Sequence, residues 1–586
     1  MKLDLIRICN FRSINDIEIK LQNLTLLVGE NNAGKSNIID AIRTFYDDRK
    51  FQETDLPKNR SNEESWIELS YSLNPNEVEL LPKKPTLEIK NGILSIRRYF
   101  KSSKHYKEKQ GNFYQSIDNY RTHIPIKGFQ LKNIPNAILG QIIYIPSLIK
   151  PSETFKTSAA SPFRNLLNSL LERSVAKQKA LTKLQSAFEN FCKEAKKSGG
   201  FIDQIKTPLN EEIKEWGIEM NMVNNPIKSE DIAKLFIGCK FQDLRSDNPS
   251  VNEEPEFALE NYGGGFQRYV IYTLLRIIPT ILAGSDSHHS NLNLSFNLIL
   301  FEEPEIFLHP TQQENMAYQL FDLANQENYQ IIIATHSAIF ASKAVQNEKD
   351  SNENFKKIVR VEKKKGELAT NIFQADNFFS NNEALLQTLQ DFKKRKDVCT
   401  NGRTKAENLI KTASEEVSNF RLPLWLNHER SILFFSNTVL LVEGATEKAL
   451  FDYLLKNKWK DLKMDHINII DVLGKYNFHH FMALMKDFGI QHGVLFDDDI
   501  HNKTNQFDLN QSINSFIKEC KNKYTLAEPV GIECDIEKFL GLNKPPRTEL
   551  KPLYMLKALT YNEIKQEKLE KLREKFCKAL NLTNKQ

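Results

Sequence analysis

A glycine-rich loop between an apolar strand and a helix constrains this chain more than any other feature. Residues 29–36 read GENNAGKS, which has the spacing GxxxxGK[ST]. The apolar run 24–28 predicts a buried strand before the loop, and residues 37–45 predict a helix after it. In this setting backbone amides and the start of the helix can bind a triphosphate, with Lys35 on the terminal phosphates and Ser36 on a metal ion. We therefore expect an ATP site that includes Asn32, Gly34, Lys35 and Ser36.

Such a loop needs acidic partners for its metal ion and for water, and a second buried strand supplies them. After Asn297, residues 298–301 form an apolar run that leads into Glu302 and Glu303. An apolar run without alternation is typical of a strand that is buried on both faces of a parallel sheet. We expect Glu302 to be the carboxylate on the metal side and Glu303 to be the base that orients water.

Two more segments are expected at the same site. Residues 331–334 form another apolar strand, and His336 follows it at the edge where open α/β sheets bind ligands. The glycine triplet 263–265 precedes a helix predicted over 269–278, so it would form a second helix N-terminus that can bind an anion. Each signal is weak when taken singly, but their order along the chain favours one split nucleotide site.

Carboxylates also follow two apolar strands in the C-terminal part of the chain. One strand leads into Glu443 and Glu447, and another leads into the run Asp497–Asp499. Neighbouring parallel strands that end in carboxylates concentrate negative charge, which hard divalent cations relieve. Because alternate residues of an extended segment share a face, we expect Asp497 and Asp499 to lie together and the residue between them to turn away.

Composition limits the cellular setting and the kinds of partner. The 586 residues carry a net charge of only +5, which is too small a field to argue for nucleic acid by itself, so any polyanion would be met locally. The seven cysteines lie far apart without a CxxC pair, which indicates reduced thiols. Asp4 and Arg7 interrupt the apolar stretch that a signal peptide needs, and no run of apolar residues is long enough to span a bilayer. We expect a cytoplasmic protein that makes no contact with a membrane.

The pattern of apolar residues changes along the chain and predicts five segments. A helical period between residues 161 and 216 predicts an apolar helical hairpin, which as an insert needs a partner surface. A polar helical stretch with the basic run Lys393–Lys396 separates the two α/β parts. We expect residues 1–160 and 227–375 to form two parts of one ATPase domain, 161–226 a helical dimerisation insert, 376–430 a helical connector, and 431–586 a second α/β domain.

The first set of motifs resembles the ATP-binding-cassette (ABC) ATPases of the SMC and RecF type. By this resemblance residues 29–36 are the Walker A loop, 304–310 the D-loop and His336 the switch histidine. The resemblance adds to the nucleotide site Arg12, Gly263, Gly264, Gly265, Gln267 and Glu302, with Glu303 and His336 as catalytic residues. The chain departs from the family at three points: Glu302 replaces an aspartate, the signature loop reads GGGFQ, and Gln141 precedes its strand. Because this family binds ATP between two heads, the resemblance implies a head-to-head homodimer.

The second set resembles the Toprim fold, with Glu443 as its glutamate motif and Asp497 and Asp499 as its DxD motif. An ATPase head followed by a Toprim domain resembles the overcoming-lysogenisation-defect (OLD) family of nucleases, in particular the class of the Gabija nuclease subunit and of effectors found with some retrons. Asp535 and Glu537 resemble the downstream acidic motif of the family, and they would share one face if that segment is extended. Lys551 resembles the family's lysine that meets the scissile phosphate. Lys544 is the competitor for the role of this lysine.

The resemblance implies both a fold class and a function. The fold class is α/β, with an ABC-type (SMC/RecF-like) ATPase head, a helical dimerisation insert and a C-terminal Toprim domain. The function is an ATP-binding, metal-dependent DNA endonuclease of antiphage defence, in which ATP controls access to the nuclease. Two Mg²⁺ or Mn²⁺ ions would be held by Glu443, Glu447, Asp497, Asp499, Asp535 and Glu537. Implied partners are DNA, further copies in a dimer or tetramer, and a UvrD-like helicase or a retron reverse transcriptase with its RNA and DNA.

Two other functions compete with this interpretation. The first is an SMC/RecF-like ATP-dependent DNA-binding assembly protein whose Toprim domain does not cleave. The second is a topoisomerase or a primase, since both use Toprim carboxylates. A topoisomerase also needs a tyrosine nucleophile on a DNA-binding domain, and a primase needs a priming apparatus. No segment of the sequence predicts either one, and the ATPase head argues against both.

Overall fold

The computed structural model describes most of the chain outside its middle third. The described residues are 1–57, 63–80, 87–104, 112–117, 122–126, 139–147, 179–197, 297–326, 329–346, 351–364, 366–375, 382–398, 400–412, 423–462, 467–500 and 508–582, with scattered residues between 200 and 273. Contacts divide the chain into one unit made of residues 1–145 and 291–586 and a second unit of residues 146–290.

The described part of the second unit is small. It contains helix α6 (Lys179–Lys196) and a two-stranded antiparallel sheet of β9 (Lys240–Phe241) and β10 (Phe257–Ala258). Helix α6 falls within the predicted insert 161–226, and its helical state agrees with the leucine period of that stretch. Most of the insert lies outside the described residues, so its role in dimerisation stays a prediction.

The first unit begins with an antiparallel sheet that is built from short hairpins. Its strand order is β2-β1-β4-β5-β6-β7. The strands are β1 (Lys2–Phe11), β2 (Ile14–Lys20), β4 (Ser65–Ser72), β5 (Ile93–Lys101), β6 (Phe113–Ile117) and β7 (Thr122–Pro125), with the short helix α2 (Pro75–Leu80) between β4 and β5. Buried and more exposed residues alternate along β2, because one face of an antiparallel sheet packs on the core.

The second sheet of this unit carries the phosphate loop. Its order is β14-β13-β3-β12-β11-β8, and all neighbours are parallel except β13 and β14. The strands are β3 (Leu24–Val28), β8 (Gln141–Ile145), β11 (Asn297–Glu302), β12 (Tyr329–Ala334), β13 (Ile358–Glu362) and β14 (Asn371–Gln374), and the helices are α1 (Lys35–Phe45), α10 (Pro310–Ala324), α11 (Ala338–Gln346) and α12 (Ser351–Lys356). Every residue of β3 is buried, as the unbroken apolar run predicts.

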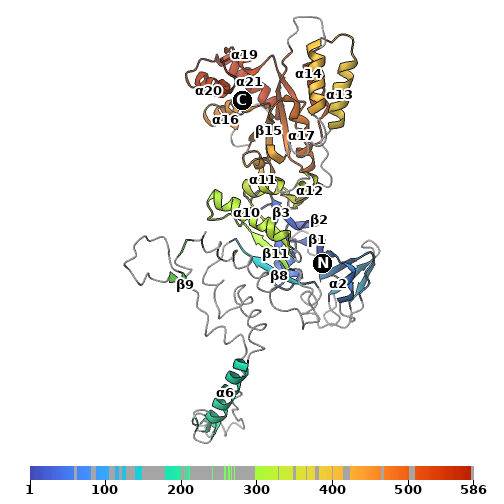
Figure 1. The fold of residues 1–586 in the computed structure, drawn as a ribbon, viewed down its shortest axis with the longest axis vertical. Coiled ribbons are helices and arrows are strands. Elements are labelled where there is room, and N and C mark those ends of the chain that lie inside the picture. The colour runs from blue at the N-terminus through green and yellow to red at the C-terminus, as the bar shows by residue number, and fades with distance from the viewer. Residues whose placement is uncertain are drawn as a thin grey trace. The chain divides into compact units, whose positions relative to one another are not determined.

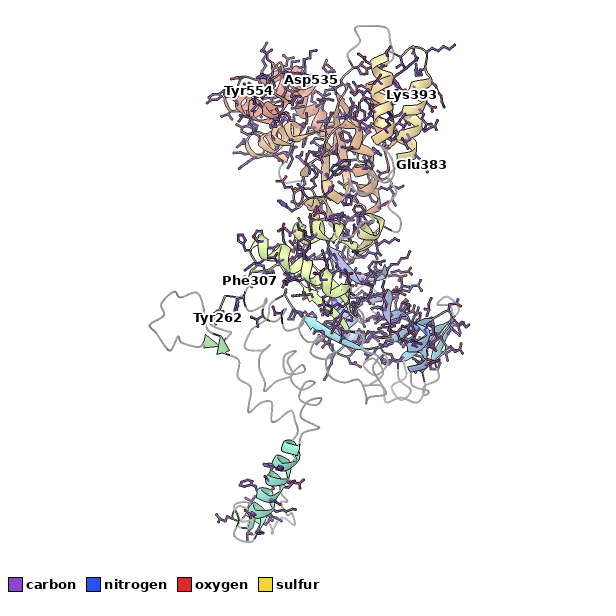
Figure 2. The ribbon with its side chains drawn as sticks, in the orientation of Figure 1. Tyr262, Phe307, Glu383, Lys393, Asp535 and Tyr554 are labelled. Carbon is purple, nitrogen blue, oxygen red and sulfur yellow. The ribbon has the colours of Figure 1, made fainter. Side chains whose placement is uncertain are left out.

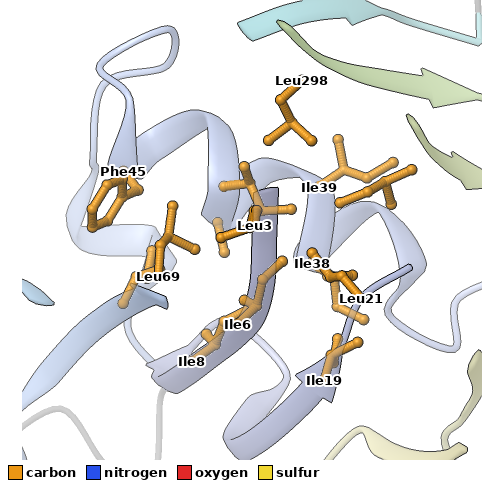
Figure 3. Close-up of a cluster of buried hydrophobic side chains, with 14 of the residues drawn as sticks. Leu3, Ile6, Ile8, Ile19, Leu21, Ile38, Ile39, Phe45, Leu69 and Leu298 are labelled. Carbon is orange, nitrogen blue, oxygen red and sulfur yellow. The ribbon is translucent and has the colours of Figure 1, made fainter. Parts of the chain in front are cut away.

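Helix α1, which follows the phosphate loop, joins the two sheets through one hydrophobic core (Figure 3). Ile38 and Ile39 on the helix pack in the same cluster as Ile6 of the antiparallel sheet and Leu298 of the parallel sheet. All four side chains are almost fully buried. The helix that starts at the phosphate loop is therefore fixed on both sides, which gives the loop a rigid base.

A third sheet forms the C-terminal part of the first unit (Figure 1). Its four strands are parallel in the order β16-β15-β17-β18. They are β15 (Thr438–Val442), β16 (Ile467–Asp471), β17 (Gln491–Asp497) and β18 (Val530–Ile532), with helices α16 (Ala445–Asn457), α17 (Phe478–Asp487), α18 (Leu509–Glu519), α19 (Ile536–Leu540), α20 (Lys551–Thr560) and α21 (Gln566–Ala579). Phe451, Trp459 and Phe576 meet in its core, with ring centroids 5.3–6.2 Å apart.

The predicted connector contains two helices, α13 (Asn382–Lys394) and α14 (Thr400–Thr412), that pack on each other (Figure 1). Helix α13 also packs against α18 of the C-terminal sheet domain. Three residues of the basic run Lys393–Lys396 are paired with acidic residues, as in the contact between Lys393 and Glu407. In the part of the chain that the structure describes, no helix combines the length and apolar character needed to cross a bilayer.

Candidate nucleotide and metal sites

The phosphate loop has the backbone conformation that its glycines predict. Gly29 has φ 142° and Gly34 has φ 114°, values that other residues rarely adopt. A Cβ atom on Gly29 would lie 2.1 Å from the carbonyl oxygen of Val361, and one on Gly34 would lie 2.4 Å from the hydroxyl of Thr370. Both positions therefore require glycine. Asn32 is left-handed and exposed on the loop, and Ser36 is exposed at the start of α1.

Lys35 points back into its own loop. Its ammonium donates hydrogen bonds to the carbonyl oxygens of Gly29, at 2.9 Å, and Glu30, at 2.8 Å. Burial lowers the pKa of Lys35 to about 8, although nearby carboxylates, Glu303 and Glu305 first among them, oppose that shift. A buried cation held only by backbone carbonyls gains when anionic phosphates replace them as partners.

The acidic pair and the histidine meet at the carboxyl ends of neighbouring strands. Glu302 ends β11, and Glu303 follows it with φ 45°, a left-handed conformation that is uncommon for glutamate. His336 follows β12, and its Nε2 lies 3.5 Å from Oε1 of Glu303. Burial and the charge of Lys35 lower the pKa of His336 to about 4, so the imidazole is neutral near pH 7. The structure thus places Lys35, Glu303 and His336 at one site.

Glu305 also belongs to this group, although the sequence patterns assigned it no role of its own. Its Oε1 accepts a hydrogen bond of 2.6 Å from the backbone amide of His336. Its Oε2 is buried and has no hydrogen-bond partner among the described residues. Burial raises the pKa of Glu305. The carboxyl group therefore fixes the turn that carries His336, a contact between residues 31 positions apart that no local motif reveals.

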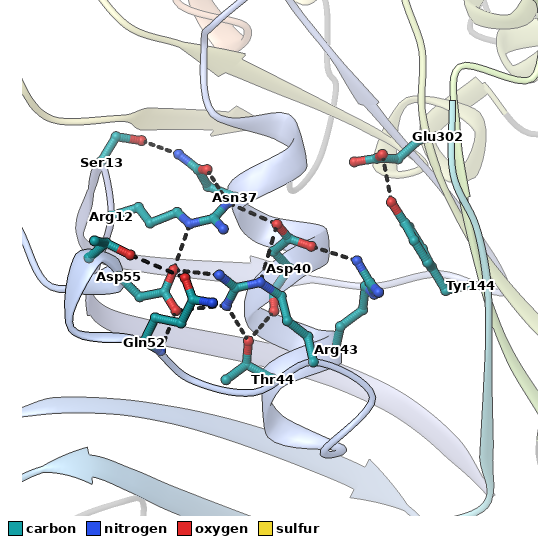
Figure 4. A network of polar contacts seen from close by, with 12 residues as sticks. Arg12, Ser13, Asn37, Asp40, Arg43, Thr44, Gln52, Asp55, Tyr144 and Glu302 are labelled. Atoms are coloured by element: carbon teal, nitrogen blue, oxygen red, sulfur yellow. Dashed lines mark hydrogen bonds and ion pairs between the residues drawn. The ribbon is translucent and has the colours of Figure 1, made fainter. Parts of the chain in front are cut away.

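Arg12 lies beside helix α1, within a network of charged side chains (Figure 4). Its guanidinium donates to Asp55 at 2.9 Å, to Asp40 at 2.8 Å and to Asn37 at 3.1 Å. The neighbouring Ser13 bonds Asn37 and Thr370. The structure therefore brings Arg12 next to the first turns of α1, where two carboxylates of the same domain bind it. Contact of Arg12 with a nucleotide stays a prediction.

The glycine-rich signature loop is largely undescribed. Gly264, Gly265 and Gln267 lie outside the described residues, as does most of the predicted helix 269–278. Gly263 is described, and a Cβ atom there would meet nothing within 4 Å. These residues belong to the second unit, so their role at the nucleotide stays a prediction.

The C-terminal carboxylates converge where β15 and β17 end. Glu443 follows β15, and the amide of Gly474 donates to its backbone carbonyl at 2.8 Å. Glu447 lies in the first turn of α16, where its carboxylate accepts a hydrogen bond of 3.0 Å from the amide of Gly444. Asp497 ends β17, and its Oδ2 accepts from the amide of Ile536 at 3.2 Å. Glu447 and Asp497 are buried, and Glu443 is partly exposed.

Mutual repulsion shows in the electrostatics of this cluster. Burial, and then the charges of Glu447, Glu443 and Asp499, raise the pKa of Asp497 to about 9. Burial, and then the charge of Glu443, raise the pKa of Glu447 to about 7. The pKa of Glu443 is raised by burial as well. Several carboxyl groups in one buried place cannot all ionise unless a cation joins them.

The two outer residues of the run Asp497–Asp499 face this cluster, and the middle one does not. Asp499 has φ 49°, so the chain leaves the extended conformation there, and its Oδ2 lies 3.9 Å from the ammonium of Lys475. The carboxyl group of Asp498 lies against Gly531, where a Cβ atom would come within 2.1 Å of it. Its Oδ1 also accepts a hydrogen bond of 3.4 Å from the side-chain amide of Asn514 on α18.

Asp535 and Glu537 do not lie on an extended segment, so the condition under which they would share one face of a strand is not met. Asp535 is the N-cap of helix α19, where its Oδ1 accepts from the amide of Lys538 at 2.8 Å, and Glu537 lies in the first helical turn. An aspartate at an N-cap satisfies an amide that the helix leaves unpaired, which favours a helix start over a strand. Lys544 contacts Asp535 at 2.7 Å, and Lys551 contacts Glu537 at 2.9 Å. Both candidate lysines therefore reach the acidic residues.

Lys475 is a third cation of this site. Its ammonium is buried and donates to the backbone carbonyl oxygens of Asp497 and Asp498. Asp471, at the end of β16, is instead bound by Arg430 at 2.6 Å, so its charge is already balanced. The sequence patterns indicated neither contact, because the partners come from separate elements.

The residues present fit a divalent cation in charge and chemistry. Oε2 of Glu443 and Oδ1 of Asp497 are buried and have no hydrogen-bond partner among the described residues, so oxygen ligands are available. Within the described ranges, however, no three His, Cys, Asp or Glu side chains converge closely enough to hold an ion as they stand. Lys544 and Lys551 occupy the positions beside Asp535 and Glu537. Coordination of an ion by Asp535 or Glu537 would compete with these lysines.

Two protein families match the chain. A family described as the AAA ATPase domain matches residues 1–341. A family described as the Toprim domain of overcoming-lysogenization-defect-protein-like proteins matches residues 434–499. Together they confirm the predicted order of an ATPase head followed by a Toprim domain. The domain boundaries stay predictions.

Three curated nucleases are similar over most of the chain. The Old nuclease of Escherichia phage P2 is 26% identical over 528 residues, which are 85% of this chain and 77% of the phage protein. The endonuclease GajA of Bacillus cereus strain VD045 is 22% identical over 552 residues, or 91% and 82% of the two chains. The OLD nuclease of Thermus scotoductus is 22% identical over 513 residues, or 84% and 81%.

Solved structures resemble the chain more weakly. An SMC head bound to the C-winged helix domain of ScpA has a TM-score of 0.35 at 14% identity and covers 64% of this chain and 97% of that chain. The SMC head domain of Thermotoga maritima has a TM-score of 0.31 at 14% identity, with 64% and 100% covered. Scores this low carry no argument about this chain.

Proposed function

Because the chain belongs to the AAA ATPase domain family and also carries an OLD-like Toprim domain, we propose that it is an ATP-binding, metal-dependent DNA endonuclease of antiphage defence. The similarity to an Old nuclease and to an endonuclease GajA supports the reaction class. The observation that carries the proposal is the convergence of Glu443, Glu447 and Asp497 at the ends of β15 and β17, with pKa values raised by burial and by one another.

The residues of this chain divide the work at the proposed nuclease site. Two ions, either Mg²⁺ or Mn²⁺, would be held among Glu443, Glu447, Asp497, Asp499, Asp535 and Glu537. Such ions supply activation of water and neutralisation of the developing charge. Lys475 holds the turn after β17 through two backbone carbonyls, which fixes the direction of its carboxylates. Lys551 would give up its contact with Glu537 and offset the charge of the scissile phosphate, or Lys544 would do so from Asp535.

Metal removal tests the proposed reaction. Supercoiled plasmid incubated with the chain and Mg²⁺ or Mn²⁺ should give nicked or linear product, and EDTA should abolish that product because the carboxylates alone cannot activate water. Agarose gel electrophoresis measures both outcomes. Cleavage that persists in EDTA would contradict a metal-dependent site. The absence of cleavage with every ion would favour the non-cleaving alternative.

ATP control of the nuclease needs a physical link between the two domains, and Arg360 offers one. Arg360 lies on β13, where it is paired with Val28 of the phosphate-loop strand. Its buried guanidinium donates to the carbonyl oxygens of Phe488, at 3.1 Å, Gly489, at 3.4 Å, and Ser436, at 3.0 Å. These residues come shortly before β17 and β15, the two strands that end at the carboxylates. We propose that nucleotide state reaches the Toprim domain through this contact.

Replacing Arg360 by Lys tests the link. Lysine keeps a buried positive charge but lacks the planar fork that reaches several carbonyls at once. We expect the affinity for nucleotide to stay within about 2-fold of that of the unmodified chain. The ATP response is the ratio of the cleavage rates with and without ATP, and it should come closer to one by a factor of about 5, the lower end of typical allosteric coupling. Cleavage assays and nucleotide titrations measure the two quantities.

Arg98→Lys is the matched control for this variant. Arg98 donates to the backbone carbonyls of Thr44 and Phe45 and pairs with Asp47, all within the ATPase domain. The control should therefore leave the ATP response of cleavage unchanged. An ATP response in Arg360→Lys equal to that of the unmodified chain would contradict control through Arg360.

Assembly and partners remain part of the proposal. Phe307, which is labelled in Figure 2, lies in the predicted D-loop 304–310. Its backbone φ is 66°, and its side chain is 66% exposed. Because the family that the chain resembles binds ATP between two heads, we propose a homodimer in which Phe307 is a candidate contact with the second head. DNA is the proposed substrate. A UvrD-like helicase or a retron reverse transcriptase is the proposed defence partner.

One observation favours the alternative of a non-cleaving ATP-dependent DNA-binding protein. Lys544 pairs with Asp535 and Lys551 pairs with Glu537, so protein cations neutralise these two carboxylates. A Toprim domain whose lysines replaced its metal ions would keep its fold and lose catalysis. The metal-dependence experiment separates the two functions, because only the nuclease releases product.

A further inference from the structure

Glu302 is a long side chain that must hold one direction to serve as a metal-side carboxylate. It ends β11, is 9% exposed, and acts electrostatically on Lys35 of the phosphate loop. The phenol of Tyr144 donates a hydrogen bond of 2.9 Å to its Oε2 (Figure 4). A glutamate side chain has three rotatable bonds, so the backbone alone does not determine where its carboxylate points. A hydrogen bond to the carboxylate restricts these rotations.

The register of the sheet explains how Tyr144 reaches Glu302. Strand β8 runs parallel to β11, and Tyr144 is paired with Leu300. Because alternate residues of a strand share a face, Tyr144 and Glu302 project from the same side of the sheet. The phenol is the donor of this pair, because an ionised carboxylate can only accept.

The ring of Tyr144 is fixed on its other side by the helix of the phosphate loop. The guanidinium carbon of Arg43 lies 3.5 Å from the ring centroid. Arg43 is in the last turn of α1 and donates to Asp40, at 2.9 Å, and to Asp48, at 2.7 Å. Tyr144 therefore touches both halves of the nucleotide site, namely the helix that starts at Lys35 and the carboxylate of Glu302.

We infer that Tyr144 is a positioning residue that orients Glu302 toward the divalent ion of a bound nucleotide. The phenol occupies Oε2 and leaves Oε1 as the oxygen available to the ion or to its water shell. This inference rests on the proposed nucleotide site. Residues that orient a metal ligand in this way contribute about 10- to 100-fold to metal affinity or activity.

Tyr144→Phe isolates the hydroxyl group, because phenylalanine keeps the ring on Arg43. The measurement is a calorimetric titration of a non-hydrolysable ATP analogue, with EDTA and at several Mg²⁺ concentrations. In EDTA, we expect the affinity for the analogue to be unchanged. Mg²⁺ should increase that affinity, and the Mg²⁺ concentration that gives half of this increase should be about 10-fold higher in the variant. An unchanged Mg²⁺ dependence would overturn the inference. An unmodified chain that bound no nucleotide would instead overturn the proposed nucleotide site.

Two further variants separate positioning from stability. Tyr46→Phe removes a buried hydroxyl that bonds Tyr71 at 2.6 Å in the same domain, and it should leave the Mg²⁺ dependence unchanged. Glu302→Gln removes the charge on which Tyr144 acts. Combining it with Tyr144→Phe should then change the Mg²⁺ dependence no further than Glu302→Gln alone, since coupled residues are not additive. Additive effects would mean that Tyr144 acts on the ion by another route.

Discussion

Replacing Asp497 by Asn should abolish most metal-dependent cleavage. The change keeps the size of the side chain but removes the charge of a buried residue at the centre of the Toprim cluster. Removing a group that only orients a metal ligand lowers metal affinity or activity by about 10- to 100-fold. Loss of a ligand itself should therefore lower the rate of plasmid cleavage by more than about 100-fold. Glu443→Gln should have the same effect, because both side chains carry a buried oxygen without a hydrogen-bond partner among the described residues.

The matched control is the next residue in the chain. Asp498→Asn makes the same chemical change, but that carboxyl group lies against Gly531 and Asn514 and away from the cluster. It should keep cleavage within a few-fold of the unmodified chain. If Asp497→Asn and Glu443→Gln cleaved plasmid as fast as Asp498→Asn, the Toprim domain would not be the nuclease.

The pH dependence of stability is a second measurement for Asp497→Asn, and it does not depend on cleavage. The pKa of Asp497 rises from 3.8 to about 9 in the folded chain, so the folded state keeps a proton that the unfolded state releases. The stabilisation from this group is complete below pH 3.8 and is lost as the pH rises toward about 9. In EDTA, the melting temperature should therefore fall as the pH rises within that window. Asp497→Asn should flatten the fall, and Mn²⁺ should oppose it most at high pH, because ligands bind as anions.

Sites whose residues are contiguous or end neighbouring strands could be predicted from the sequence. The phosphate loop is one short segment, and its glycines are required by local backbone angles and close contacts. Glu443 and Asp497 could be expected to meet because parallel strands present their carboxyl ends at one edge. The sequence left open whether the segment of Asp535 is extended, and the structure shows a helix there, because an aspartate before an apolar residue is also a helix N-cap signal.

Contacts between distant segments account for what the sequence could not reveal. Tyr144 and Glu302 are 158 positions apart, and Arg430 and Asp471 are 41 apart. Each pair depends on which strands become neighbours, which periodicity does not specify. Arg360 reads as an ordinary charged residue in a strand, yet its guanidinium is buried between two domains. Such residues fix the functional groups in place, and only the assembled fold identifies them.

Replacing Lys35 by Ala should remove nucleotide binding. In the loop the ammonium already makes two charge-assisted hydrogen bonds to carbonyl oxygens, and phosphate oxygens are stronger acceptors for it. Two such bonds, each of about 1.5 to 3 kcal/mol, correspond to a dissociation constant for ATP at least about 100-fold higher. Calorimetric titration measures that loss. Lys343→Ala is the control, because Lys343 contacts Tyr318 and Glu314 away from the loop and should leave ATP affinity unchanged.

Lys35→Ala also tests whether the nucleotide site and the nuclease site act separately. Lys35 is a buried cation whose pKa burial lowers to about 8, so its removal also removes a desolvation cost and should not lower the melting temperature. A folded Lys35→Ala chain should still cleave plasmid with Mg²⁺ or Mn²⁺, at a rate that no longer responds to ATP. ATP affinity equal to that of Lys343→Ala would refute the nucleotide site. An ATP response that survived the loss of binding would mean that ATP acts on cleavage without this loop.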